Sequence, residues 1–115
     1  MTRDRLYIIH IIECIDYIDS YISGDFKSLE NDHKTYDAVL RQLQIMSEST
    51  KRLSGEVKQR NSEIQWREIA GFRNILVHDY LGDIDASTVR AVIIDELPKL
   101  KAAMQRELTL IDRIA

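Results

Sequence analysis

The feature of this sequence that most constrains its fold is the scarcity of residues that end helices. Only one proline and four glycines are spread over 115 residues, and β-branched residues do not alternate with polar ones as they do in strands. Apolar residues instead recur every three or four positions, which is the spacing of one face of an α-helix. The sequence therefore predicts an all-α protein.

Long segments with this helical spacing are separated by short polar breaks. The first three segments are residues 3–22, 34–53 and 63–78. Gly24 lies in the first break, and Asn61 or Ser62 is expected to cap the third helix. The apolar arc of the first segment is wider than one core face requires, which predicts burial on two sides, the second side being a possible subunit interface.

The fourth segment carries one long apolar stripe from Val89 to Ile111, with Asp85 or Ser87 as the expected N-cap. Pro98 is expected to kink or restart this helix, because proline lacks the backbone donor and clashes with the preceding turn. Four amphipathic helices with short connections favour an antiparallel four-helix bundle with a kinked C-terminal helix. We expect a single domain over residues 1–115, assembled as a homodimer.

The charge pattern limits the function. A net charge of −3 argues against nonspecific coating of nucleic acid, because neutralisation of phosphates supplies most of that affinity. Residues 51–73, however, hold six basic residues against three acidic ones, so a polyanion is expected to approach there. The charges between Lys51 and Arg60 are read either as a solvated face or as a guide for RNA.

The N-terminal segment is apolar but is interrupted by His10, Glu13 and Asp16, which makes it neither a signal peptide nor a membrane span. Cys14 is the only cysteine and fits a buried thiol in a reducing compartment. A cytoplasmic protein is expected. His10 and Glu13 are read as a polar strip in preference to a metal pair, and His33 is expected to be solvated.

The stretch "RNILVHDY", residues 73–80, places polar groups inside an apolar helical pattern. On a helical wheel Arg73 and Tyr80 fall within the stripe centred on Ile69, so Arg73 needs an anion, an acceptor or a cleft. His78 falls about 140° away from Arg73. Either the last turn loosens and brings His78 round, or the two groups meet across a two-fold axis between subunits. We favour the second arrangement.

An arginine and a histidine suit phosphodiester chemistry in RNA without a metal or cofactor. A neutral imidazole can accept the proton of a 2′-hydroxyl or return one to the leaving oxygen. A guanidinium can donate two hydrogen bonds to the phosphate where charge develops. Asn74 and Asp79 are supporting candidates that could orient the His78 ring. The simpler alternative is that Arg73 forms an ion pair and His78 is solvated. Trp66, Phe72 and Leu76 could stack on bases, but packing in the core is the preferred interpretation.

The segment "IQWREIAGFRNILVHDYLGDID", residues 64–85, resembles the HEPN superfamily and within it the HepT-like toxins. That group carries an arginine, four residues, a histidine, any residue and a tyrosine, which here correspond to Arg73, His78 and Tyr80. The "ELPKL" near the end and the overall length are also similar, so that the resemblance covers the whole chain.

The resemblance implies a metal-independent endoribonuclease that acts as the toxin of a type VII toxin–antitoxin pair. Arg73 and His78 would be its catalytic residues, in a cleft that a homodimer forms. The antitoxin implied is a small nucleotidyltransferase that transfers AMP from ATP to Tyr80. The alternatives are a non-catalytic helical module that partners a nucleotidyltransferase or binds nucleotide, and a purely structural dimer in which His78 is replaceable.

Overall fold

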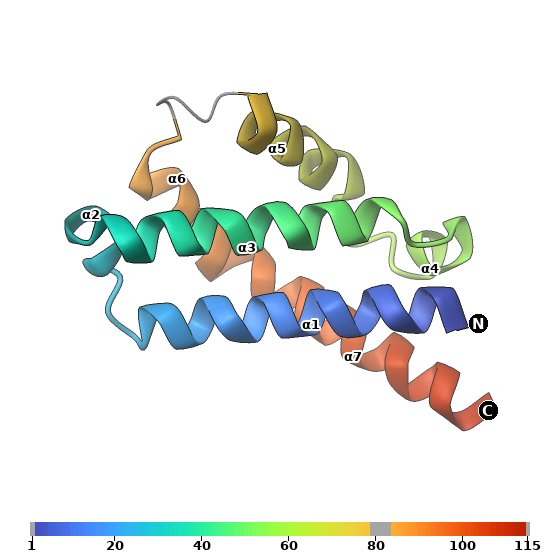
Figure 1. Ribbon diagram of the computed structural model, residues 1–115. Coiled ribbons are helices and arrows are strands. Elements are labelled where there is room, and N and C mark those ends of the chain that lie inside the picture. The colour runs from blue at the N-terminus through green and yellow to red at the C-terminus, as the bar shows by residue number, and fades with distance from the viewer. Residues whose placement is uncertain (1, 79–83, 115) are drawn as a thin grey trace.

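The computed structural model describes residues 2–78 and 84–114, and every regular element in these two stretches is a helix, as the sequence predicted (Figure 1). The elements are α1 (Thr2–Ile22), α2 (Ser28–Asn31), α3 (His33–Lys51), α4 (Gly55–Arg60), α5 (Trp66–His78), α6 (Ala86–Ala91), the π-helical turn η1 (Val92–Glu96) and α7 (Leu97–Ile114). The long helices α1, α3, α5 and α7 correspond to the four predicted segments.

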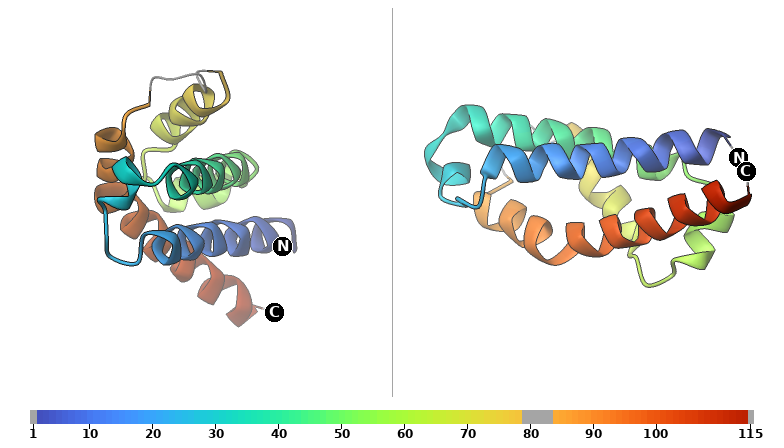
Figure 2. Two further views of the ribbon diagram at one scale, coloured as in Figure 1. Left: turned by 60° about the vertical axis from the view of Figure 1, so that its left-hand side comes forward. Right: turned by 90° about the horizontal axis from the view of Figure 1, so that it is seen from below.

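The long helices pack in a fixed order. Helix α1 contacts both α3 and α7, whereas α5 contacts α3. Figure 1 shows α3 between α1 and α5, and the first view of Figure 2 shows the same succession from another side. The start of α1 and the end of α7 lie at the same end of the molecule (Figures 1 and 2). Helix α5 is therefore an outer helix that is covered mainly on its α3 side.

Most of the wide apolar arc of α1 is accounted for within the chain, whereas Leu6, Tyr17 and Tyr21 of the same helix are exposed. Ile8, Ile11 and Ile18 are fully buried, and Cys14 is buried beside them. Because α1 packs against α3 on one side and α7 on another, both apolar sides of the helix have neighbours. The two-sided burial was predicted, but it does not require a second subunit. Burial also raises the pKa of the Cys14 thiol to about 11.

Polar side chains define the ends of α3 and α4. Asp32 caps α3, because its carboxylate accepts a hydrogen bond from the backbone N–H of Lys34 at 3.0 Å. The break predicted between the second and third segments contains the short helix α4, which Ser54 caps. The buried Asp4 of α1 accepts from the backbone N–H and the hydroxyl of Ser54 at 2.9 and 2.7 Å. This contact ties α1 to the start of α4.

Helix α5 begins at Trp66, three residues later than predicted, and the expected cap by Asn61 or Ser62 was wrong. Asn61 is buried, and its side-chain amide donates to the carbonyl of Val57 at 2.8 Å, so it closes α4 instead. The Trp66 indole N–H lies 3.2 Å from the carbonyl of Lys58 and 3.1 Å from that of Asn61. These bonds fix where α5 starts.

The last predicted helix is divided as Pro98 required, but the division is a π-helical turn. Asp85 caps α6 by accepting from the backbone N–H of Thr88 at 2.8 Å, as predicted. Five residues of π-helix, Val92–Glu96, then lead into α7, and the backbone N–H of Leu97 bonds to the carbonyl of Val92. A wider turn directly before Pro98 fits the loss of its backbone donor.

Two side-chain interactions join segments that are far apart in the sequence. The Tyr36 hydroxyl donates to the carbonyl of Ile84, which anchors the segment before α6 to α3. The Lys101 ammonium pairs with Asp16 of α1 at 2.6 Å. Within residues 2–78 and 84–114, no helix is long and apolar enough to cross a membrane.

Candidate active site

Arg73 lies on the face of α5 that is turned toward α3, as the helical wheel predicted. Its side chain is 23% exposed. The guanidinium Nε and Nη2 both donate to the same carboxylate oxygen of Glu48 on α3, at 3.1 and 2.9 Å. Its third nitrogen, Nη1, donates to the Asn74 side-chain oxygen at 3.1 Å. The anion that a half-buried guanidinium needs is thus supplied by Glu48.

Asn74 does not orient His78 as proposed from the sequence. Its side-chain oxygen accepts from Arg73, the residue before it, and the Asn74 side chain is exposed. Arg73 is therefore held from two sides, by Glu48 across the helix pair and by Asn74 on its own helix. Such a clamp fixes the direction of the guanidinium.

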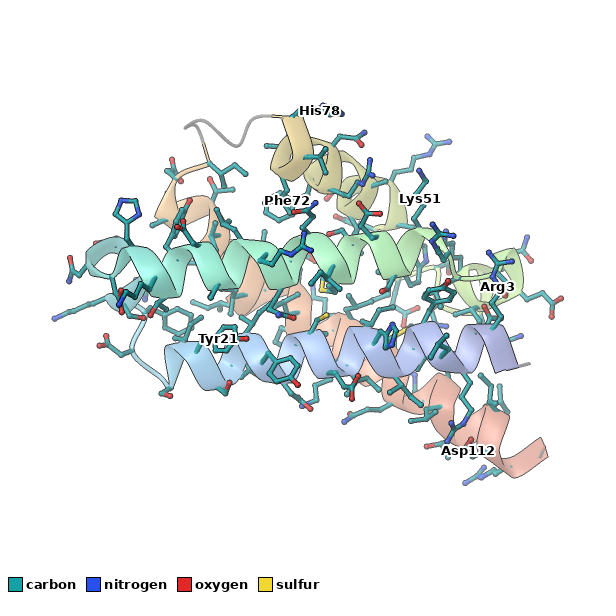
Figure 3. The ribbon with its side chains drawn as sticks, in the orientation of Figure 1. Arg3, Tyr21, Lys51, Phe72, His78 and Asp112 are labelled. Carbon is teal, nitrogen blue, oxygen red and sulfur yellow. The ribbon has the colours of Figure 1, made fainter. Side chains whose placement is uncertain are left out.

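His78 is the last residue of α5 and is exposed. Figure 3 shows it at the end of α5, on the side away from α3. The helix keeps its α-helical form through His78, so the last turn does not swing the imidazole toward Arg73. Five residues of regular helix separate the two by about 7.5 Å along the axis and about 140° around it. One chain by itself does not bring them together.

The other polar residues singled out from the sequence lie partly outside the residues that the structure describes. Asp79 and Tyr80 lie outside the described residues. His10, Glu13 and His33 are all exposed, in keeping with the solvated roles expected of them. No group of three or more potential metal ligands occurs among residues 2–78 and 84–114.

Leu76 is buried, and Trp66 and Phe72 are partly buried against the core. The indole N–H of Trp66 is also hydrogen-bonded to backbone. Core packing, which the sequence favoured over a base-stacking shelf, accounts for all three side chains.

Some of the basic side chains in residues 51–73 are already paired with acidic residues of the same chain. Arg60 is committed to the buried Glu107 of α7, with Nη2 at 2.7 Å from one carboxylate oxygen and Nε at 3.2 Å from both. Arg73 is committed to Glu48. Lys51 and Arg52, at the end of α3, are exposed. Sequence reasoning missed Glu48, although the need of Arg73 for an anion was evident.

A small polar groove runs along α3 beside Glu48. We call it the α3 groove, and its volume is about 330 Å³. It is lined by Tyr7, Arg41, Gln44, Ile45, Glu48, Ser49 and Arg52. Its α3 residues recur at helical spacing, a signal in the sequence that could have found it.

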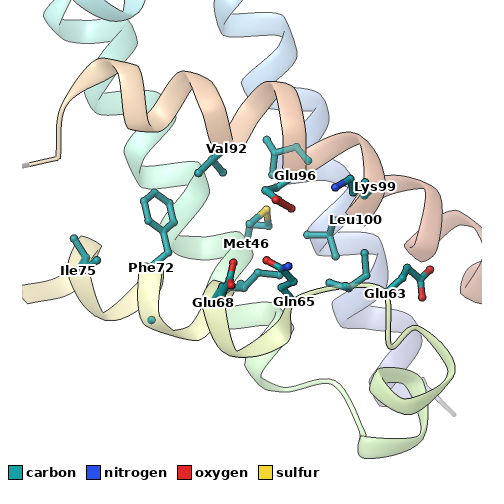
Figure 4. Close-up of a pocket in the computed structure, with 14 residues that line it drawn as sticks. Met46, Glu63, Gln65, Glu68, Phe72, Ile75, Val92, Glu96, Lys99 and Leu100 are labelled. Atoms are coloured by element: carbon teal, nitrogen blue, oxygen red, sulfur yellow. The ribbon is translucent and has the colours of Figure 1, made fainter.

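A larger apolar groove of about 430 Å³ lies between α5 on one side and η1 and α7 on the other. We call it the α5–α7 groove, and Figure 4 shows Phe72 of α5 facing Val92 of η1 across it, with Met46 of α3 at its base. Glu63, Glu68, Glu96 and Lys99 stand among its lining residues. Phe72 and the adjacent Arg73 lie about 100° apart around α5, so Phe72 lines this groove while Arg73 bonds to Glu48.

Comparison with known proteins agrees with this combination of helices and motif. The HepT-like family model, described as ribonuclease HepT-like, matches residues 11–107. The chain therefore belongs to the HepT-like family, whose matched region contains both Arg73 and His78.

Individual relatives span most of the chain. A protein of Caldanaerobacter subterraneus subsp. tengcongensis named "Putative RNase" is 30% identical over 93% of this chain and 99% of its own length. A Thermococcus cleftensis protein named "Probable ribonuclease HepT" is 32% identical over 87% of this chain and 91% of its own. A Methanocaldococcus jannaschii protein named "Gamma-glutamylcyclotransferase and putative RNase" is 31% identical over 98% of this chain, which spans only 51% of that relative. No solved structure matches the chain.

Proposed function

We propose that this protein is a metal-independent endoribonuclease in which Arg73 and His78 are the catalytic residues. The observation that carries the proposal is the clamp on Arg73, which directs a half-buried guanidinium one and a half turns from an exposed imidazole in a HepT-like chain. A guanidinium so placed can donate two hydrogen bonds to a phosphate, and the imidazole is free to transfer protons.

The reaction proposed is an internal transfer of the phosphate. The 2′-oxygen attacks the adjacent phosphorus, the bond from phosphorus to the 5′-oxygen breaks, and a 2′,3′-cyclic phosphate and a 5′-hydroxyl result. His78 accepts the 2′-hydroxyl proton or protonates the leaving 5′-oxygen. Arg73 stabilises the negative charge that develops on the non-bridging oxygens.

The active unit proposed is a homodimer with a cleft shared between protomers. Within one chain α5 stays regular, which leaves Arg73 and His78 on different sides of the helix. Helix α5 is also an outer helix with an exposed apolar residue, Ile75, at 45% exposure. A two-fold axis near α5 would let Arg73 of one protomer face His78 of its partner.

The test is cleavage of a fluorescent single-stranded RNA in the presence of EDTA. We expect the wild type to cut it, Arg73→Ala to lower the rate about 10²- to 10³-fold and His78→Ala about 10²- to 10⁴-fold. An RNA with a 2′-deoxy nucleotide at the cut site should resist. Equal rates for wild type and His78→Ala would remove the nuclease proposal and favour a non-catalytic binding module.

The shared cleft has its own test, in which Arg73→Ala and His78→Ala chains are mixed and allowed to exchange. If the two groups come from different protomers, each mixed dimer holds one intact site, and about a quarter of the wild-type activity should return. If both groups act within one protomer, every mixed dimer lacks an intact site, and mixing should restore nothing.

The biological setting proposed is a type VII toxin–antitoxin pair. The phenol oxygen of Tyr80 would attack the α-phosphorus of ATP on a nucleotidyltransferase, forming a phosphodiester and releasing pyrophosphate and the phenolic proton. The added AMP brings negative charge and bulk close to His78, which would repel and obstruct RNA. Mass spectrometry after incubation with the nucleotidyltransferase and ATP should find AMP on Tyr80, and Tyr80→Phe should remove it.

A further inference from the structure

All residues of the α3 groove except Tyr7 lie along one face of α3 and its C-cap. Arg41, Gln44, Glu48 and Arg52 follow one another at steps of three or four residues, so their side chains leave α3 on the same side. Arg41 and Arg52 are separated by about 16 Å along the helix axis. Tyr7 of α1 also lines the groove.

The two arginines of the groove differ in their partners from four other arginines of the chain. Arg5, Arg60, Arg73 and Arg106 each pair with a carboxylate. For Arg41 and Arg52, which are both exposed, no such pair occurs within the described parts of the chain. Their positive charges are therefore available to an external anion.

More positive charge lies at the end of the groove where Arg52 stands. Arg3 at the start of α1 and Lys51 at the end of α3 are exposed. Figure 3 places these two side chains at the same end of the α1–α3 pair. Asp4, the neighbouring acid, is buried against Ser54 and contributes little to the surface. An approaching polyanion meets a cationic rim there.

The α3 groove adjoins the candidate catalytic arginine directly. Glu48 lines the groove, and the same carboxylate oxygen accepts from Arg73 at 2.9 and 3.1 Å. The guanidinium of Arg73 is thus one hydrogen bond from the wall of the groove. The apolar α5–α7 groove is a separate one, with Phe72 and not Arg73 in its wall.

We infer that the α3 groove binds the backbone of single-stranded RNA and leads it to Arg73. Arg41 and Arg52 contact separate phosphates, and the ring of Tyr7 offers a face on which a base can stack. Glu48 is a positioning residue that holds Arg73 at the side of this path. The inference rests on the proposed ribonuclease function and names the surface by which its substrate enters.

The experiment measures binding of a fluorescein-labelled 20-nucleotide RNA of mixed sequence to the full chain carrying His78→Ala, so that the RNA stays intact. Arg41→Gln with Arg52→Gln should weaken binding about tenfold and lower the slope of log Kd against log salt by about 1.4. The matched control is Lys27→Gln with Lys34→Gln. It removes the same amount of charge from two exposed residues outside the groove, the N-cap of α2 and the first turn of α3.

Tyr7→Leu provides a second, uncharged test. It keeps apolar volume beside the core, so it should weaken binding without changing the salt slope. Circular dichroism should show the same helix content in all variants. Unchanged affinity in the groove pair would overturn the inference. The same loss of affinity in the groove pair and the control pair would also overturn it, because only net charge would then matter.

Cleavage by the otherwise wild-type chain separates this inference from the proposed function. A wild type that cuts RNA, combined with a groove pair whose KM is unchanged, would overturn the groove and leave the nuclease. A wild type that cuts no RNA would overturn the nuclease, while weaker binding by the groove pair alone would still support a path for RNA. Weaker binding together with a raised KM and a nearly unchanged kcat is the result expected.

Discussion

Two arginine–glutamate pairs each join two helices in this protein, yet they differ in which partner is buried. In the pair of α4 and α7, the carboxylate of Glu107 is only 6% exposed and Arg60 is 44% exposed. In the pair of α5 and α3, Arg73 is 23% exposed and its partner Glu48 is 39% exposed. The first pair covers a buried acid, whereas the second holds a cation near the surface.

The hydrogen bonds of the two pairs differ in the same sense. Both carboxylate oxygens of Glu107 accept from Arg60. Only one oxygen of Glu48 accepts from Arg73. A buried carboxylate with both oxygens bound is a structural element, because leaving it unpaired is costly. The guanidinium of Arg73 uses three of its five N–H groups for Glu48 and Asn74, so two remain to donate to a phosphate while Glu48 holds it.

The largest difference expected between the two pairs is in the rate of RNA cleavage. We expect Arg73→Lys to lower RNA cleavage about 10²-fold or more, because an ammonium cannot donate the paired hydrogen bonds of a guanidinium. The same change at Arg60 should leave the rate near that of the wild type. Initial rates on a fluorescent RNA measure both, and a similar loss for the two variants would erase the distinction drawn between the pairs.

For the stability of the fold, the Arg60–Glu107 pair should matter more than the Arg73–Glu48 pair. Glu107→Ala should lower the free energy of unfolding by about 1.5–3 kcal/mol, since it removes hydrogen bonds between a buried carboxylate and a charged partner. Glu48→Ala should lower it by less than about 1 kcal/mol, as is usual for exposed ion pairs. Urea denaturation of the two variants gives the comparison, and equal losses would count against a structural role confined to Glu107.

The two acids should also differ in how pH affects them. Hydrogen bonding to Arg60 lowers the pKa of Glu107 in the folded protein, although burial opposes this shift. A lowered folded pKa means that the stabilisation is complete above the ordinary value of about 4.3 and is lost as pH falls through the folded value. The stability gap between wild type and Glu107→Gln should therefore shrink between pH 6 and pH 3. Urea midpoints at several pH values would measure it, and a constant gap would contradict the assignment.

The smallest effect is expected for the charge of Glu48 on RNA binding. Glu48→Gln, made together with His78→Ala, should tighten binding of a single-stranded RNA about two- to fivefold, because it removes a negative charge worth roughly 0.5–1 kcal/mol from the side of the path. Cleavage by Glu48→Gln alone should fall, since Arg73 loses one side of its clamp. Fluorescence anisotropy and initial rates test the two statements separately, and tighter binding with faster cleavage would make Glu48 an inhibitor of the site.

Much of the fold could be predicted from local patterns. The four long helices, the cap at Asp85 and the disturbance before Pro98 all depend on residues within a few positions of one another. The start of α5 was wrong by three residues because Asn61 bonds back to Val57 and the Trp66 indole bonds to the carbonyls of Lys58 and Asn61. Neither interaction has a signal in the hydrophobic period.

The candidate site was only half predictable for the same reason. The helical wheel placed Arg73 on the inner face and His78 away from it, and both placements agree with the structure. It did not identify Glu48, which lies 25 positions earlier in the chain. Helical spacing alone could place Arg41, Glu48 and Arg52 on one side of α3, but it could not indicate that this side would lie next to Arg73.

By itself, the sequence determined that the chain is helical, where its long helices run and that Arg73 would need an anion, since these follow from spacing along one backbone and from the cost of burying a charge. Only the tertiary structure decided that α7 covers the second apolar side of α1 and that Glu48 is the anion for Arg73. Those outcomes depend on which helices become neighbours, and helix packing is set by the whole surface of each helix rather than by any local run of residues.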